Sequence, residues 1–122
     1  MAERQLQKQI EKDINRTELF WAVSVDAKPV WFKGRWIKSR AKSGVSDLLV
    51  FCRLDNRIIL MEIKQPGKTL TPNQKKFREL CQMNNVIYGV TNSVLGALQN
   101  LQYWVQLWGY RDRQLEAILS QM

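Results

Sequence analysis

Residues 44–74 decide the fold, and their sequence is GVSDLLVFCRLDNRIILMEIKQPGKTLTPNQ. Two apolar runs, Asp47–Leu54 and Arg57–Gln65, predict two β-strands. The Asp55-Asn56 pair between them is typical of a two-residue hairpin turn. Pro66-Gly67 ends the second run, and the following Thr-Pro-Asn-Gln is typical of a helix start. The stretch therefore predicts a β-hairpin followed by a helix.

Three charged residues fall at one end of this hairpin. Glu62 and Lys64 alternate along the second strand, so they share a face. If the turn has two residues, Leu54 pairs with Arg57 and Asp47 lies opposite Lys64, on that same face. A shift of one residue in the register would move Asp47 to the other face. The other residues of both faces are apolar, which predicts inner strands that are covered on both sides.

The chemistry of this trio has two interpretations. Asp47 or Glu62 could form a structural salt bridge with Lys64. Two carboxylates with one lysine nevertheless leave an excess negative charge, which a divalent cation can neutralise. The chain has no histidine, and its cysteines, Cys52 and Cys81, lack metal-ligand spacing and are expected to be buried thiols. A hard cation is therefore the metal that these ligands suit.

The flanking sequence predicts further elements around the hairpin. One mixed α/β domain, with the order α-β-β-β-α-β-α-α, is expected to span residues 1–122, with residues 96–122 as a C-terminal helical extension. Helices are expected at 3–16, 71–84, 93–106 and 111–122, strands at 19–25 and 86–91, and an irregular or loosely extended segment at 26–43.

Composition and charge narrow the function. Nineteen Lys and Arg residues against eleven Asp and Glu give a net charge of +8, which favours a nucleic-acid partner over a role in solubility alone. The absence of histidine excludes Ser-His and Cys-His nucleophilic schemes. The charged N-terminus and the lack of a long apolar run predict a soluble cytoplasmic protein without a membrane partner.

The motifs in 44–74 resemble those of the virus-type replication-repair nuclease (VRR-NUC) domain of the PD-(D/E)xK nuclease superfamily. The resemblance rests on Gly44-Val-Ser-Asp47, on Glu62-Ile63-Lys64 with the Pro-Gly that follows, and on Thr71-Pro-Asn-Gln74. It covers about residues 3–92, and Ser46 replaces the family's proline. The resemblance implies a restriction-endonuclease-like domain, in which a mixed sheet is flanked by helices.

The resemblance also implies roles for individual residues. Asp47, Glu62 and the main-chain carbonyl of Ile63 would bind Mg²⁺ or Mn²⁺, and Lys64 would orient the attacking water. Glu3 would be a supporting carboxylate in the first helix, with Glu11 as its rival. Gln74 would face the catalytic cleft, although a capping box with Thr71 accounts for it equally well.

These roles imply a metal-dependent endodeoxyribonuclease. The rival interpretation is a non-catalytic DNA-binding protein on the same fold. Stand-alone domains of this family resemble Holliday-junction resolvases, which implies branched or four-way junction DNA as the substrate and a homodimer. The apolar stretch from Leu98 to Tyr110 could form the dimer face or belong to the domain's own core.

A basic segment is the candidate DNA-contacting loop. Its aromatic residues Trp31, Phe32 and Trp36 could stack on bases or fill the core. Its cationic residues, expected to bind phosphates, are Lys28, Lys33, Arg35, Lys38, Arg40 and Lys42.

Overall fold

The structure is a computed structural model that describes residues 2–25, 30–37 and 46–122. Its helices are α1 (Glu3–Asn15), α2 (Pro72–Met83), α3 (Val94–Leu107) and α4 (Arg113–Ser120). Its strands are β1 (Phe20–Ser24), β2 (Val30–Phe32), β3 (Arg35–Ile37), β4 (Leu48–Cys52), β5 (Ile58–Ile63) and β6 (Ile87–Thr91). The predicted α/β class and the order of the main elements are confirmed.

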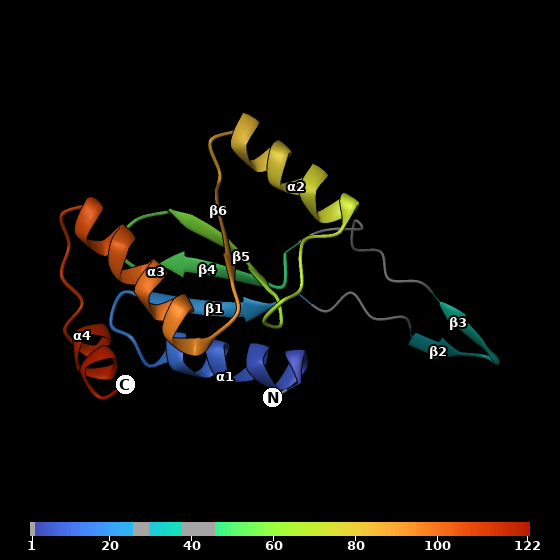
Figure 1. The fold of residues 1–122 in the computed structure, drawn as a ribbon, viewed down its shortest axis with the longest axis horizontal. Coiled ribbons are helices and arrows are strands. Elements are labelled where there is room, and N and C mark those ends of the chain that lie inside the picture. The colour runs from blue at the N-terminus through green and yellow to red at the C-terminus, as the bar shows by residue number, and fades with distance from the viewer. Residues whose placement is uncertain (1, 26–29, 38–45) are drawn as a thin grey trace.

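The central sheet has four strands in the order β1-β4-β5-β6 (Figure 1). β4 is antiparallel to both β1 and β5, whereas β6 is parallel to β5. The parallel pairing requires a crossover, which α2 supplies between β5 and β6. The ends of β5 and β6 consequently lie side by side at one edge of the sheet.

One face of the sheet carries the hydrophobic core. Alternate strand residues such as Leu48, Val50 and Ile59 point to this face and are at most 1% exposed. They pack with Ile10 of α1 and Leu98 of α3, which are fully buried in the same cluster. Part of the apolar C-terminal stretch thus belongs to the domain's own core, as one of the two interpretations held.

The opposite face is only partly covered. α2 packs beside β6, where the rings of Phe77 and Tyr88 meet edge to face, and Figure 1 shows the sheet between α1 and α2. Trp21, Val23 and Ile58, which point to this face, are 38–41% exposed. The expectation that both faces of the hairpin are covered is therefore wrong, because α2 covers only the β6 side.

The register of the hairpin also differs from the prediction. Leu49 lies opposite Leu60, so the pairing is shifted by two residues and Asp47 falls opposite Glu62. The loop contains four residues, and the Cys52 N–H donates to the carbonyl of Arg57 across it at 3.0 Å. A shift of two preserves the side-chain alternation, so the predicted faces remain correct.

Asp55 explains the longer loop. Its carboxylate accepts hydrogen bonds from the Arg57 N–H at 2.9 Å and from the Tyr110 hydroxyl at 2.9 Å. A two-residue type I′ turn would require positive φ at both Asp55 and Asn56, and neither has it. The contact with Tyr110 is tertiary and was not visible in the local sequence.

The segment expected to be irregular contains a second, two-stranded sheet. β2 and β3 pair with each other, and Lys33 and Gly34 between them have φ values of 49° and 79°. These values suit the type I′ turn that joins short antiparallel strands.

Within the described ranges, no helix combines the length and apolar character that crossing a bilayer would need.

Candidate functional site

Asp47 stands immediately before β4 and is held by backbone contacts. Its Oδ2 accepts a hydrogen bond from the Ile63 N–H at 2.9 Å. Its main-chain carbonyl accepts two more, from the Val25 N–H at 2.8 Å and from the Gln7 side-chain amide at 3.3 Å. The carboxylate is thereby fixed against the end of β5, where Glu62 and Lys64 emerge.

Glu62 is the most unusual residue of the site, because it is a carboxylate that is only 1% exposed. Its Oε1 accepts a hydrogen bond from the Gln74 amide at 2.8 Å. Its Oε2 is buried and has no partner among the described residues. Burial raises the pKa of Glu62 from 4.5 to about 9, together with the adjacent Asp47 carboxylate, which can accept a hydrogen bond from Glu62 only when Glu62 is protonated and repels it when it is ionised. Lys64 opposes this increase, and Glu3 adds to it.

Gln74 contacts both the cap of α2 and Glu62, so its position is compatible with both of the roles considered for it. Its Oε1 accepts from the Thr71 N–H at 2.9 Å, and the Thr71 hydroxyl accepts from the Gln74 N–H at 3.2 Å, which completes a capping box. Its Nε2 donates to Glu62. One amide therefore caps α2 and orients a site carboxylate at the same time.

Lys64 follows β5, and its N–H donates to the carbonyl of Thr91 at 2.9 Å. Within residues 2–25, 30–37 and 46–122, no ion pair within 4.0 Å links Lys64 to Asp47 or Glu62. The salt bridge that would make this trio purely structural is thus not formed between these side chains.

The first helix presents two polar residues to the site. Glu3 is close enough for its charge to raise the pKa of Glu62. Gln7, one turn further along α1, donates to the Asp47 carbonyl. Glu11, the rival acidic residue, instead accepts a hydrogen bond from the Ser24 hydroxyl at 2.5 Å. Sequence reasoning missed Gln7, although its spacing of four from Glu3 places both on one helix face.

The donor set fits a hard divalent cation. Asp47 and Glu62 supply only oxygen, and the partnerless Oε2 of Glu62 is a buried acceptor that a cation would satisfy. Among the described residues, no three Asp, Glu or Cys side chains form a group that could hold a metal by themselves. The arrangement thus suits Mg²⁺, which commonly takes one or two carboxylates and completes its shell with water and phosphate.

Two further polar groups beside the site were not anticipated. The hydroxyl of Tyr88 and the Nε of Arg78 are buried and have no hydrogen-bond partner in the described part of the chain. Burial and the charge of Glu62 raise the pKa of Tyr88. Tyr88 lies opposite Leu60 on β5, so it shares the face of Glu62, but this pairing depends on the parallel register of β6.

The structure bears on only part of the predicted DNA-contacting segment. Lys33 and Arg35 are exposed on the β2–β3 hairpin. Lys28, Lys38, Arg40 and Lys42 lie outside the described residues, as do the side chains of Trp31, Phe32 and Trp36.

Comparisons with known proteins agree on one family. The VRR-NUC domain profile matches residues 3–95, which is most of the chain. Among solved structures, a protein described as "VRR_NUC domain protein" is similar, with a TM-score of 0.60 and 20% sequence identity. The match covers 88% of this chain and 90% of that one, and at this identity it shows a shared fold. No curated protein matches the chain.

Proposed function

This chain belongs to the VRR-NUC domain family, and we propose that it is a Mg²⁺- or Mn²⁺-dependent endodeoxyribonuclease that hydrolyses DNA phosphodiester bonds. The family is one of nucleases, and the metal dependence and the DNA substrate are inferred. One observation carries the proposal: Glu62 is buried beside Asp47 with one oxygen unsatisfied and a raised pKa. A protein retains such a costly group where a bound ligand completes it.

In the proposed mechanism the residues of the site have different roles. Asp47 and Glu62 would hold the cation, with the Ile63 carbonyl as a further ligand. When bound, the cation supplies a nucleophilic water at neutral pH and neutralises charge on the scissile phosphate. Lys64 places an ammonium group where negative charge develops in the transition state.

Three neighbouring groups would keep this arrangement rigid. The Ile63 N–H fixes one oxygen of Asp47, and Gln7 fixes its main chain. Gln74 fixes one oxygen of Glu62, and the other oxygen, Oε2, has no hydrogen-bond partner among the described residues. Restraining the carboxylates before the substrate binds lowers the cost of assembling the transition state.

For the substrate we propose branched or four-way junction DNA, cut by a homodimer. The net charge of +8 supports a polyanionic partner. Tyr103 and Leu107 on α3 are 58% and 60% exposed. These side chains are not used in the domain's own core, so they are available for a contact between subunits. Sedimentation analysis tests the dimer, and loss of dimerisation in Leu107→Glu without unfolding would support this contact.

The decisive test is cleavage of labelled duplex, nicked, flap, single-stranded and four-way junction DNA with Mg²⁺ or Mn²⁺. Cleavage of at least one substrate is expected, and chelation of the metal should abolish it. Asp47→Ala and Glu62→Ala should each reduce cleavage at least about a hundredfold while DNA binding is retained. Removing a carboxylate also removes repulsion of the phosphates, so binding should be equal or tighter.

The rival, a non-catalytic DNA-binding protein, makes the opposite predictions. It would bind DNA without cutting it, and Mg²⁺ would not raise its melting temperature. The nuclease should gain thermal stability from Mg²⁺ or Mn²⁺, and Asp47→Ala should lose that gain. Normal cleavage by Asp47→Ala would refute the proposed mechanism.

A further inference from the structure

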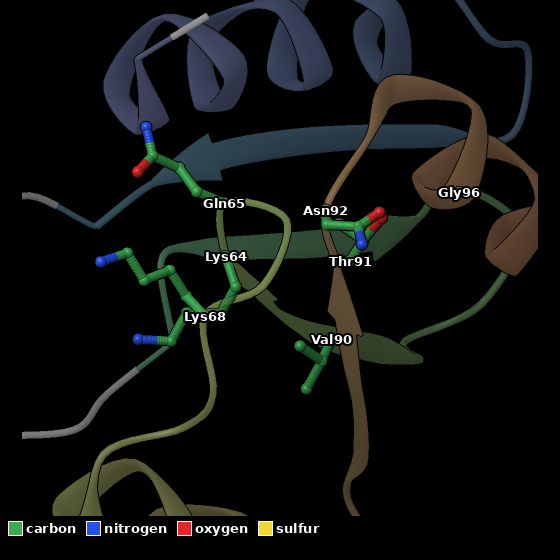
Figure 2. A pocket seen from close by; sticks show the side chains of 7 residues that line it. All are labelled: Lys64, Gln65, Lys68, Val90, Thr91, Asn92 and Gly96. Carbon is green, nitrogen blue, oxygen red and sulfur yellow. The ribbon is translucent and has the colours of Figure 1, made fainter.

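A hollow of about 240 Å³ opens beside Lys64, where the parallel strands β5 and β6 end. Such ends are a common location for ligands in sheets that contain parallel strands. Figure 2 shows that the side chains of Lys64 and Lys68 extend to the same side of this hollow. Its lining residues are Lys64, Gln65, Lys68, Val90, Thr91, Asn92 and Gly96.

A tight turn holds Lys68 at the hollow. The Lys68 N–H donates to the carbonyl of Gln65 at 3.0 Å, and Pro66 and Gly67 occupy the two central positions. Gly67 has a φ of 82°, which is the value that the third residue of a type II turn requires. Proline and glycine both favour this geometry, so the chain reverses here and Lys68 is held next to Gln65.

Glycine also shapes the other wall. A Cβ atom on Gly96 would lie 2.8 Å from the Thr91 hydroxyl and 2.9 Å from the Ser93 hydroxyl. Both distances are too short, so a larger residue would displace the hydroxyls of Thr91 and Ser93, the second of which caps α3. Gly96 thus allows the β6 end and the α3 start to approach closely at the edge of the hollow.

The charge of the hollow points to an anion. Its lining contains two lysines and no acidic residue. Across the described ranges, neither Lys64 nor Lys68 has an ion-pair partner within 4.0 Å. The two lysine side chains extend in the same direction (Figure 2), so both positive charges would attract a phosphate group bound beside them.

We propose that this hollow binds the DNA backbone phosphate next to the scissile one, with Lys68 as the contacting residue. The inference rests on the proposed nuclease function, in which Lys64 serves the scissile phosphate. The turn of Gln65 to Lys68 separates Lys68 from Lys64, so the assignment gives Lys68 the neighbouring phosphate of the same strand and leaves the scissile one to Lys64. Binding at this site should not depend on the DNA sequence, because a lysine contacts phosphates as a point charge.

The test compares Lys68→Ala with Lys12→Ala, which removes an exposed lysine from the last turn of α1 and changes the net charge equally. Binding to labelled duplex and junction DNA is measured by fluorescence anisotropy, with chelator present, from about 50 to 200 mM salt. Lys68→Ala should make the slope of log K against log salt shallower by about 1. Lys12→Ala should leave the slope unchanged.

Single methylphosphonate substitutions then locate the phosphate. Each substitution neutralises one phosphate near the cleavage position and should weaken binding. At the phosphate that Lys68 contacts, the losses of affinity from the substitution and from Lys68→Ala should not add, because both remove the same contact. Additive losses at every position would overturn the inference, as would equal slopes for Lys68→Ala and Lys12→Ala. If the wild-type protein cuts DNA, those results contradict only the assignment of Lys68. If the wild-type protein cuts no DNA, the proposed nuclease function is refuted.

Inorganic phosphate is the other source of the same chemistry. It is compared with chloride at equal ionic strength, and the melting temperature is measured. Stabilisation that Lys68→Ala loses, together with an unchanged DNA slope, would overturn the DNA assignment in favour of free phosphate. No stabilisation, together with the shallower DNA slope, supports the backbone site.

Discussion

Asp112 and Glu62 are both acidic side chains that are almost fully enclosed, and their surroundings differ. Asp112, at 0% exposure, caps α4, and its carboxylate accepts from the N–H of Leu115 at 2.8 Å. It also accepts from Glu18 at 3.1 Å and Leu19 at 2.8 Å, just before β1. Glu62, at 1% exposure, receives one amide hydrogen bond and keeps an unsatisfied oxygen.

The difference distinguishes Asp112, a structural carboxylate, from Glu62, for which we propose a function in metal binding. Three N–H donors satisfy Asp112, so its buried charge joins the C-terminal helix to the chain before β1. One oxygen of Glu62 has no hydrogen-bond donor among the described residues, and an unsatisfied buried acceptor costs about 1–3 kcal/mol. The fold tolerates that cost at the one end of the sheet where Asp47 and Lys64 also converge.

Removing the structural carboxylate should have the largest effect on stability. Asp112→Ala leaves three N–H groups without their acceptor and removes the cap of α4. The free energy of unfolding should fall by about 3 kcal/mol, measured by urea denaturation. Glu116→Ala is the control, because its ion pair with Arg111 lies at the surface and should contribute less than about 1 kcal/mol. Equal losses in the two variants would contradict the assigned role of Asp112.

Neutralising the Glu62 carboxylate should instead raise the free energy of unfolding. In metal-free protein the pKa of Glu62 is raised from 4.5 to about 9. Between these pH values the unfolded chain loses the proton and the folded protein keeps it, so the free energy of unfolding falls as pH rises. Glu62→Gln eliminates this dependence and should exceed wild type by about 2 kcal/mol near pH 8.

Urea denaturation with chelator from pH 5 to pH 8 measures this effect. The curves of wild type and Glu62→Gln should diverge as pH rises, and parallel curves would count against the raised pKa. Adding Mg²⁺ should then stabilise the wild type and leave Glu62→Gln unchanged, because the variant lacks the carboxylate. The measurement thus separates the cost of the empty carboxylate from the gain on metal binding.

Much of this site follows from the alternation of strand residues. That alternation assigned Glu62 and Lys64 to one face, and it placed Asp47 there even though the register was wrong by two residues. The error came from the loop, whose length depends on the contact between Asp55 and Tyr110. Contacts between residues so far apart in the chain leave no local signal, so loop length could not be predicted reliably.

Burial was harder to predict than position. The high pKa of Glu62 arises because the fold encloses it, and the strand pattern itself does not reveal which face α2 covers. The same reason hid Tyr88 and Arg78, which approach the site only through β6 and α2. The short β2–β3 hairpin had a local signal, in Lys33-Gly34 between aromatic residues, that could have identified it.

Gln74 should give the smallest of these effects, and its side chain contacts both the cap of α2 and the Glu62 carboxylate. Gln74→Ala breaks the capping box and also removes the amide that orients Glu62. Its affinity for Mg²⁺ or Mn²⁺ should fall about tenfold, since residues that orient metal ligands commonly contribute this much. Isothermal titration calorimetry measures the affinity.

Thr71→Ala is the matched control, because it damages the cap while the Glu62 contact remains. The hydroxyl of Thr71 accepts from the Gln74 N–H, and its removal should cost about 1 kcal/mol of stability. Both variants should therefore lose similar stability, whereas only Gln74→Ala should lose metal affinity. If the metal affinities fall equally, Gln74 acts through the helix cap, and its amide does not position Glu62.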